Sequence, residues 1–542
     1  MKRTPILTAD LMRRCDTHTI NSLGVPSQVL MERAAQKVVE HLEANPQRFP
    51  AEGRVLVLCG SGNNGGDGFA VARFLQEGIR GRSGSVAICY GGKLNPDGSP
   101  DKTKMSAECA RQYEYACAAL IPLFSPAQVG HMLSHTAVVV DALFGIGLDR
   151  PITGALADLI RDINERHLPI LAVDIPSGVH GDTGEIMGVA IEATDTVTMQ
   201  ALKTGLLTYP GADCCGHITV ADIGVDTSLG NTCGLYLADE ALLSHVLPPR
   251  RRRSHKGTYG HLAMVVGSEG MAGAAVLSAR GALRSGAGLV EVITPDCNRE
   301  ILQVSLPEVI VTCYDPHDVS YKSLVSRPEA SNGLVVGCGF GTSAKGAALL
   351  GAILEACPIR SDYPVILDAD ALNLIAKHPH LWESRLLTQG AGQVVITPHP
   401  MEISRLTGHS VADILADPLT AARTLASHRG VTVVLKDAHT VIAAADGHTY
   451  LCPYGNAGMA KGGSGDVLAG IIGSLAVQRR SDLGKSLSLW EVAAAGVALH
   501  GLAGDHAAGI MGEYAMTPSD IIQAMGAVTR DLSDTRSHLI NL

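Results

Sequence analysis

The sequence predicts an α/β protein with two domains, each a three-layer αβα arrangement in which a parallel sheet lies between helices. Short apolar runs alternate with helical stretches along the chain, and such a series of strand, loop and helix predicts parallel sheets covered on both faces. The chain has 542 residues, more than one ordinary hydrophobic core accommodates. Glycine contributes 60 residues, well above the usual ~7%, and aromatic residues only 4%, which suits many tight strand–helix turns.

The strands predicted in the N-terminal half each end at glycine, aspartate or another turn-forming residue. They span residues 54–59, 85–90, 137–141 and 170–174. The first unit is the clearest, with an apolar run at 55–60, a glycine-rich loop at 61–68 and a helical run at 69–78. This order is typical of the repeating unit of a parallel sheet.

A domain boundary is predicted between residues 226 and 256, where the sequence Leu-Pro-Pro-Arg-Arg-Arg-Arg at 247–253 breaks the pattern. We therefore expect a first domain at 1–228, a linker at 229–254 and a second domain at 255–535. The arginine run could suggest a nucleic-acid or targeting patch, but its proline-rich flank favours a solvated linker.

The alternation restarts after the linker. Further strands are predicted at 261–267, 333–337, 365–368, 393–397 and 432–436, and the region 487–530 is predicted to be helical.

Composition and charge argue against several classes of protein. The net charge is −10 with no sustained basic face, so nucleic acid is not expected as a partner. Thirteen cysteines show no CxxC pair and no zinc spacing, which predicts reduced thiols in a cytoplasmic protein. The first residues lack the apolar core of a signal peptide, and no stretch approaches ~18 uninterrupted apolar residues, so no membrane span is expected.

The most informative motif precedes an apolar helical run at 467–475. Gly462, Gly463 and Gly465 come directly before Asp466. Glycines let backbone N–H groups turn toward a ligand, and a helix start adds free N–H groups and a positive dipole end, so the motif predicts a phosphate site. A carboxylate beside that site repels phosphate unless it takes a proton, which indicates a general base acting on a hydroxyl that attacks a phosphoryl group. The alternative is a helix cap.

A second set of polar residues follows strands of the N-terminal half. Asn64, Asp141 and Ser177 each lie at a predicted strand end, and parallel neighbours would bring them to one sheet edge. Their oxygens could coordinate a hard monovalent or divalent cation. The alternative is that each residue only forms a local turn. Asp67 could hold a ribose hydroxyl or cap the following helix.

The segments NNGGDGFAVAR, DALFGIGL and AVDIPSGVHGDTG resemble the epimerase domain of the NAD(P)H-hydrate repair family. The resemblance covers roughly residues 10–225. It implies a Rossmann-like fold, interconversion of the R and S epimers of hydrated NADH and NADPH, and a potassium ion at Asn64, Asp141 and Ser177. Asp174 would be the proton-transfer group at the substrate. The implied substrate loops are Asn63, Asn64, Gly65, Gly66 and Asp67, and Gly145, Ile146, Gly147, Leu148, Asp149, Arg150 and Pro151.

The C-terminal half resembles the ribokinase-like, ADP-dependent NAD(P)H-hydrate dehydratase domain over about 245–530. HKGTYGH, GMAGAAVLSARGALRSGAGLV, LDADALN, TPHP and NAGMAKGGSGDVLAG carry the resemblance. The implied contacts to the hydrated nucleotide are Ala274, Gly339, His399 and Asp466. The implied ADP-binding residues are Lys436, Asp437, Ala438, His439, Thr440, Asn456, Met459, Lys461, Gly462, Gly463, Ser464 and Gly465. Magnesium would accompany ADP. Two positions depart from the family pattern, Cys338 in place of a frequent proline and Met401 in place of a frequent glycine.

Together the two resemblances imply a bifunctional repair enzyme whose dehydratase acts on the S form and yields AMP and phosphate. Asp466 would deprotonate the hydroxyl on the hydrated ring, and the amides of 463–465 would hold the developing negative charge. The small-molecule substrates are hydrated NADH or NADPH and ADP, and we expect a homo-oligomer. The alternative is a vitamin or sugar kinase with a non-catalytic N-terminal binding module. The preference for NADH or NADPH hydrate, and for ADP or ATP, stays open.

Overall fold

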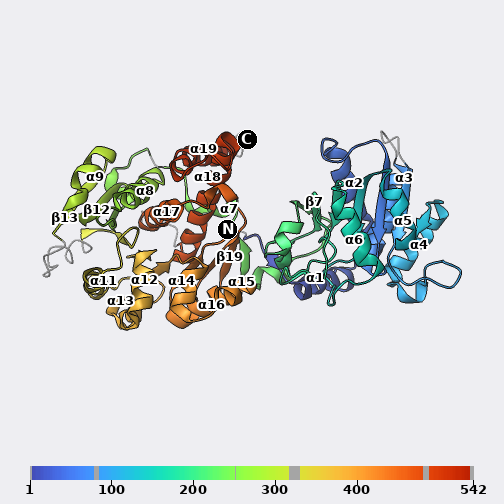
Figure 1. Ribbon diagram of the computed structural model, residues 1–542, viewed down its shortest axis with the longest axis horizontal. Helices are drawn as coiled ribbons and strands as arrows, with labels where there is room; N and C mark the ends of the chain where they lie inside the picture. The colour runs from blue at the N-terminus through green and yellow to red at the C-terminus, as the bar shows by residue number, and fades with distance from the viewer. Residues whose placement is uncertain (1–2, 79–84, 251, 316–329, 480–486, 538–542) are drawn as a thin grey trace. The chain divides into compact units, whose positions relative to one another are not determined.

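The computed structural model describes residues 3–78, 85–250, 252–315, 330–479 and 487–537 (Figure 1). The chain divides into two compact units. The N-terminal unit is Pro5–Cys233, and the C-terminal unit combines Gly234–Leu542 with the first residues, Met1–Thr4.

The N-terminal unit contains a seven-stranded sheet in the order β4-β3-β2-β5-β6-β7-β9, and all its pairings are parallel. The strands are β2 (Arg54–Cys59), β3 (Val86–Tyr90), β4 (Leu123–Phe124), β5 (Thr136–Ala142), β6 (Ile170–Val173), β7 (Asp195–Met199) and β9 (His217–Ala221). A separate two-stranded sheet pairs β1 (Ile6–Leu7) with β8 (Leu202–Lys203). The strands predicted at 54–59, 85–90, 137–141 and 170–174 are confirmed to within one residue at each end.

Helices cover both faces of this sheet. One buried cluster lies under α1 (Ala9–Asn21), α2 (Ser27–Ala44), α3 (Asn63–Glu77) and α4 (Ala107–Ala118). A second cluster lies on the opposite face under α5 (Pro126–Leu133) and α6 (Ala155–Glu165). The predicted three-layer architecture is therefore confirmed for this unit.

The C-terminal unit contains a ten-stranded sheet in the order β10-β19-β18-β17-β16-β15-β14-β11-β12-β13. Its strands are β10 (Leu235–Leu237), β11 (His261–Val265), β12 (Leu289–Pro295), β13 (Ile310–Tyr314), β14 (Gly333–Val336), β15 (Val365–Leu367), β16 (Val394–Ile396), β17 (Thr432–Leu435), β18 (Thr440–Ala443) and β19 (Thr449–Cys452). The strands predicted in this half are all present. The expectation of a wholly parallel sheet is wrong at one side, because β17, β18 and β19 are antiparallel neighbours joined by short turns.

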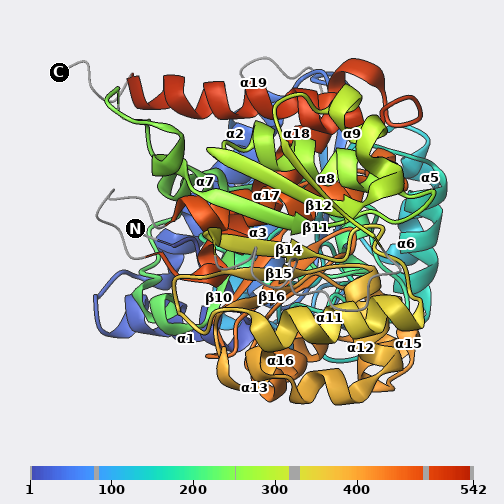
Figure 2. The same ribbon diagram turned by 90° about the vertical axis from the view of Figure 1, so that its left-hand side faces the viewer.

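This sheet also lies between two helical layers, as Figure 2 shows from one side. One layer contains α11 (Ala344–Ala356), α12 (Asp370–Lys377), α13 (Arg385–Gln389), α14 (Pro400–Thr407), α15 (Val411–Ala416) and α16 (Pro418–Arg429). The other contains α8 (Ala272–Arg284), α17 (Ser464–Gln478) and α18 (Leu489–Met511) beside α9 (Arg299–Ser305) and α19 (Pro518–Ser537). The helical end predicted at 487–530 corresponds to α18 and α19.

The interval predicted as a linker is not an extended connection. Residues 229–254 include β10 and α7 (Glu240–Val246), and both belong to the C-terminal unit. β10 pairs with β19, and the backbone N–H of Leu237 donates to the carbonyl of Thr4. Pro248 and Pro249 therefore follow an ordered helix of the C-terminal unit, and the two compact units meet in the sequence at Cys233 and Gly234. Among the described residues, none of the helices combines the length and apolar character that crossing a bilayer requires.

Candidate active sites

The first candidate site lies where β2, β5 and β6 end at one edge of the N-terminal sheet. Asp141 is fully buried, and its carboxylate oxygens accept hydrogen bonds from the backbone N–H of Ser177 (2.7 Å) and from its Oγ (2.6 Å). Asn64 Nδ2 lies 3.0 Å from the carbonyl oxygen of Phe144, which Ser177 Oγ also approaches at 3.3 Å. The structure therefore brings Asn64 and Ser177 to one carbonyl oxygen, and Asp141 joins them through its hydrogen bonds with Ser177.

These residues fit a cation. Asn64 Oδ1 is buried and has no hydrogen-bond partner within the described part of the chain. Burial raises the pKa of Asp141 to about 6, although hydrogen bonds from Ser177 and Leu143 oppose the rise. A buried carboxylate and an unsatisfied amide oxygen are both stabilised by a positive charge. Oxygen ligands of this kind suit a hard cation such as potassium.

A cavity of about 720 Å³ opens beside this cluster. Of the predicted substrate residues, those that line it are Asn63, Asn64, Asp67, Gly145, Ile146, Gly147, Leu148, Asp149, Arg150 and Asp174. Gly65, Gly66 and Pro151 lie outside the lining. Gly65 has a packing role instead, because a Cβ at this position would lie 2.0 Å from the carbonyl oxygen of Gly60. Gly65 therefore lets α3 start tightly against the end of β2, whereas a Cβ on Gly66 would lie 2.8 Å from Met31 Cε.

Asp174 lies at the end of β6 in a strained backbone conformation, with φ of 68°. Its Oδ1 accepts hydrogen bonds from Met199 N (3.0 Å) and Thr198 Oγ1 (3.2 Å) and forms a short ion pair with Lys203 Nζ. The side chain of Lys203 is fully buried, so this ion pair holds the carboxylate in place at the cavity wall.

Two more carboxyl groups of the cavity lie near this ion pair. Burial raises the pKa of Asp16 to about 6, while the charge of Lys203 opposes the rise. Burial, together with the charges of Asp174 and Asp16, raises the pKa of Asp67 well above its usual range. Asp67 is inside α3, which begins at Asn63, so it does not cap that helix. The cavity therefore combines one ion-paired carboxylate with two carboxyl groups whose pKa values are raised.

The second candidate site surrounds the start of α17 in the C-terminal unit. Gly463 is the residue before the helix and has φ of 100°, a left-handed conformation that suits glycine. Asp466 lies in the first turn. A Cβ on Gly465 would lie 3.4 Å from Lys436 Nζ, so the lysine ammonium lies beside the helix start. The predicted glycine–aspartate motif thus combines free helix N–H groups, a carboxylate and a cation.

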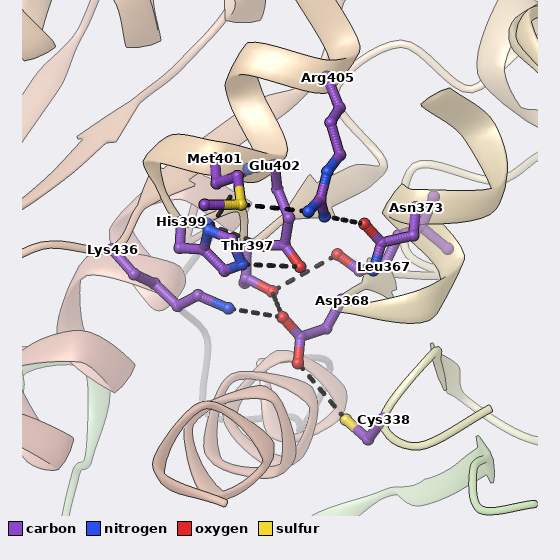
Figure 3. A network of polar contacts seen from close by, with 10 residues as sticks. All are labelled: Cys338, Leu367, Asp368, Asn373, Thr397, His399, Met401, Glu402, Arg405 and Lys436. Carbon is purple, nitrogen blue, oxygen red and sulfur yellow. Dashed lines mark hydrogen bonds and ion pairs between the residues drawn. The ribbon is translucent and has the colours of Figure 1, made fainter. Parts of the chain in front are cut away.

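A polar network joins residues at the ends of neighbouring strands of the sheet (Figure 3), and its Lys436 lies beside the helix start. Asp368 is buried after β15, and its Oδ1 accepts hydrogen bonds from Thr397 Oγ1 (2.6 Å) and Lys436 Nζ (2.8 Å). Its Oδ2 lies 3.6 Å from Cys338 Sγ. Ligand atoms of Cys338, Asp368 and Asp466 all lie within 4.8 Å of one another.

The pKa of Asp466 is raised to about 7, first by burial and then by the charge of Asp368, although Cys338 and Lys436 oppose the rise. A group with this pKa exchanges protons near neutral pH, as a general base must.

His399 also lies at this site, where it caps α14 in a reciprocal arrangement with Glu402. His399 Nδ1 accepts from Glu402 N (3.3 Å), and Glu402 Oε2 accepts from His399 N (2.8 Å). Burial and the charges of Lys436 and Arg405 lower the pKa of His399. Burial raises the pKa of Glu402 to about 7. The ring of His399 is 45% exposed, so it remains accessible to a ligand.

The other residues predicted to bind substrate or ADP occupy three places. Ala274 and Gly339 are neighbours, because a Cβ on Gly339 would lie 2.8 Å from Ala274 Cβ. Lys436–Thr440 form the turn between β17 and β18. Asn456 shapes its own loop, accepting from Gly458 N (3.0 Å) and donating to Asp505 Oδ1 (2.9 Å).

Lys461, a predicted ADP-binding residue, contacts backbone carbonyl groups of the C-terminal unit. Its ammonium donates to the carbonyl of Tyr514 (2.8 Å) and to that of Met516, beyond the end of α18. Met401, which stands where the family frequently has glycine, adds a side-chain contact, because its Sδ lies 3.1 Å from Arg405 Nη2. Arg405 in turn donates to Asn373 Oδ1 (2.7 Å).

Comparison with known proteins bears on both units. Residues 262–526 match the NAD(P)H-hydrate dehydratase family model, and residues 27–205 match the YjeF-related protein N-terminus model. The bifunctional NAD(P)H-hydrate repair enzyme of Moorella thermoacetica is 36% identical over 98% of this chain and 97% of its own length. That of Escherichia coli is 34% identical over 99% of this chain and 98% of its own. The chain belongs to the family of bifunctional NAD(P)H-hydrate repair enzymes.

A solved structure of the ADP/ATP-dependent NAD(P)H-hydrate dehydratase of Bacillus subtilis covers 55% of this chain and 98% of its own, with 26% identity and a TM-score of 0.45. The full-length relatives confirm the predicted family and the combination of an epimerase and a dehydratase in one enzyme. They support hydrate repair over the alternative of a kinase joined to a non-catalytic module.

Sequence reasoning missed some residues that the structure places at these sites. Lys203 follows a Thr-rich strand, and the sequence indicates its role only by placing one lysine within a largely apolar stretch. Asp368 ends the strand predicted at 365–368 and lies in the segment LDADALN, but the sequence assigns it no role. His500 is buried in α18 with Nε2 3.4 Å from Ser464 Oγ, and burial lowers its pKa to about 4. Its helical surroundings gave no sign of this contact.

Proposed function

We propose that the N-terminal unit interconverts the R and S epimers of hydrated NADH and NADPH and that the C-terminal unit dehydrates the S form with ADP. ADP would yield AMP and phosphate. The proposal rests mainly on the placement of Asp466 in the first turn of α17, beside Lys436 and Asp368. It also draws on what the names of the relatives say of those proteins.

In the N-terminal unit, Asp174 is the proposed proton-transfer group. Its short ion pair with Lys203 fixes its position, and the raised pKa of Asp67, which lines the same cavity, favours the protonated form of that carboxyl group. A carboxylate and a protonated carboxyl in one cavity can take a proton and return one. Asn64, Asp141 and Ser177 would hold a potassium ion, which supplies positive charge where the buried Asp141 carboxylate lies. The ion would also fix the loop that begins at Phe144.

In the C-terminal unit, Asp466 takes the proton of the hydroxyl on the hydrated ring. The oxygen attacks the terminal phosphorus of ADP, and the bond from that phosphorus to the AMP oxygen breaks. N–H groups at 463–465 and Lys436 stabilise the charge on the transferring group. The lone pair of the ring nitrogen then expels phosphate from the ring carbon that carried the hydroxyl. The next ring carbon loses a proton to solvent, which restores the dihydropyridine. Magnesium enters as part of the nucleotide substrate, bound to its phosphate oxygens.

The deciding experiment supplies both epimers of hydrated NADH with ADP and magnesium to the full chain. Recovery of the NADH absorbance together with an equal amount of free phosphate is expected. A stable phosphorylated product with no recovered absorbance would favour the kinase alternative and refute the dehydratase proposal. Without nucleotide, exchange between the two epimers should continue, because the proposed epimerisation needs no phosphoryl transfer.

Two further expectations concern the environment of the enzyme. A cytoplasmic location is supported by thirteen cysteines without CxxC or zinc spacing. A homo-oligomer stays a prediction that sedimentation analysis of the full chain would check.

A further inference from the structure

We propose that Cys338, Asp368 and Asp466 form a binding site for a thiophilic divalent cation of the zinc class, and that occupation of this site blocks the C-terminal reaction. The three side chains come from three separate elements: the loop after β14, the end of β15 and the start of α17. Their ligand atoms lie within 4.8 Å of one another, close enough for one ion to reach all three.

Asp368 is oriented for this role by groups that bind only one of its oxygens. Oδ1 accepts from Thr397 Oγ1 (2.6 Å) and Lys436 Nζ (2.8 Å), as Figure 3 shows. Oδ2 faces Cys338 Sγ at 3.6 Å. Cys338 is fully buried and Asp368 is 1% exposed, so these two ligands are held in place by the surrounding core. Hydrogen bonds to the oxygen that does not bind the metal orient such ligands.

The ligand set selects the metal. A sulfur and two carboxylates suit zinc or cadmium, whereas magnesium prefers oxygen ligands and retains its waters. Three protein ligands leave a fourth tetrahedral position for water or substrate. Binding replaces the thiol proton of Cys338, which leaves to solvent. The two carboxylates, the thiolate and the Lys436 ammonium then balance a divalent cation, so the occupied site carries no net buried charge.

The functional consequence rests on the proposed dehydratase mechanism. An Asp466 oxygen bound to a metal ion cannot accept the proton of the substrate hydroxyl. The site is therefore expected to make nucleotide-dependent dehydration sensitive to zinc, while epimerisation in the other unit continues. Cys338 supplies the sulfur ligand, so the sensitivity should depend on that residue.

The test titrates the full chain with Cd²⁺ alone and follows the ultraviolet charge-transfer absorption of a cadmium–thiolate bond. The parent chain is expected to bind one equivalent of Cd²⁺ tightly, and Zn²⁺ should displace that ion. Cys338→Ala should lose this equivalent. Asp368→Asn should weaken cadmium binding by more than the about 10–100-fold typical of losing a group that only orients a ligand, because Asp368 is itself a ligand. Cys297→Ala is the matched control, because Cys297 is exposed and distant in the sequence from the cluster. It should keep the equivalent.

An unchanged tight equivalent in Cys338→Ala, or none in the parent, would overturn the proposal. Cys338→Ser, which keeps the size of the side chain, should lose the band even if the alanine variant folds poorly. The ratio of dehydration rates with and without zinc should rise toward one in Cys338→Ser. If the parent shows no dehydration, the proposed function fails while the cadmium titration still decides the site.

Discussion

Replacing Asp466 with asparagine tests the proposed base directly. Asparagine keeps the size of the side chain and part of its hydrogen bonding but cannot accept the proton. A positioned base contributes ~10²–10⁴-fold to rate, so turnover of hydrated NADH with ADP should fall by that order. Nucleotide binding should survive or tighten, because one negative charge near the phosphates is removed. Epimerisation should not change, since it occurs in the other unit.

The same substitution should change stability in a pH-dependent way. The pKa of Asp466 is raised in the folded protein from 3.8 to about 7, mainly by burial. Folding therefore favours the protonated carboxyl, and stability falls as pH rises from about 4 to about 7. Since each pKa unit corresponds to ~1.4 kcal/mol, ionisation costs up to about 4 kcal/mol above that range. Asp466→Asn should therefore recover much of this lost free energy of unfolding above about pH 7, and little of it near pH 4.

Denaturant unfolding at several pH values and steady-state kinetics measure these effects. In the parent, kcat/KM for dehydration should rise with pH through about 7, as the base loses its proton. Asp520→Asn is the matched control, because Asp520 also lies in the first turn of a helix and accepts from Thr517 N (2.7 Å). It should leave turnover unchanged. Near-normal dehydration by Asp466→Asn would refute the base assignment. It would not return the residue to the alternative role of helix cap, because Gly463 precedes α17 and Asp466 lies inside its first turn.

Further predictions concern both units. Asp141→Ala should lower potassium-dependent epimerisation by ~10-fold or more while dehydration persists; equal loss of both activities would indicate unfolding. Lys203→Met should destabilise the N-terminal unit by ~3–5 kcal/mol in denaturant unfolding, because the buried pair with Asp174 is broken. A fragment of residues 5–233 should epimerise without nucleotide, and failure to fold would contradict its independence. Arg3→Ala should destabilise the C-terminal unit by ~1–3 kcal/mol, with Arg3→Lys intermediate; no change in its thermal unfolding would contradict this.

Some of the missed strands differ in their surroundings from the predicted ones, although β12, β18 and β19 lie buried inside a sheet and were missed as well. Apolar runs that end at glycine or aspartate, such as β2 and β15, lie in the middle of a sheet and are buried on both faces. The missed strands β9 and β13 lie at sheet edges and are largely exposed or half-buried, so their sequences are mixed. β7 is buried but has the sequence Asp-Thr-Val-Thr-Met, which carries no apolar run.

The sequence could predict those site residues that lie at the ends of parallel strands. Parallel strands end at one edge, which explains why Asn64, Asp141 and Ser177 meet as expected. The partners of the acids could not be predicted in the same way. Lys203 reaches Asp174 across 29 residues, and Lys436 reaches Asp368 across 68. Such pairs depend on the order of strands in the sheet, which a single sequence does not specify.

The first residues of the chain extend this argument to the domain boundary. Arg3 pairs with Glu491 (2.9 Å), 488 positions later, and its guanidinium carbon lies 5.0 Å from the ring centroid of Trp490 and 5.2 Å from that of Tyr236. Both rings belong to the C-terminal unit, as does β10, to which Thr4 hydrogen-bonds. A boundary drawn by composition separates segments that pack together. A C-terminal fragment that begins at residue 234 therefore keeps the edge strand β10, whereas a fragment that begins at residue 255 loses it. Both fragments lack Arg3, whose guanidinium lies against the rings of Tyr236 and Trp490 in the full chain.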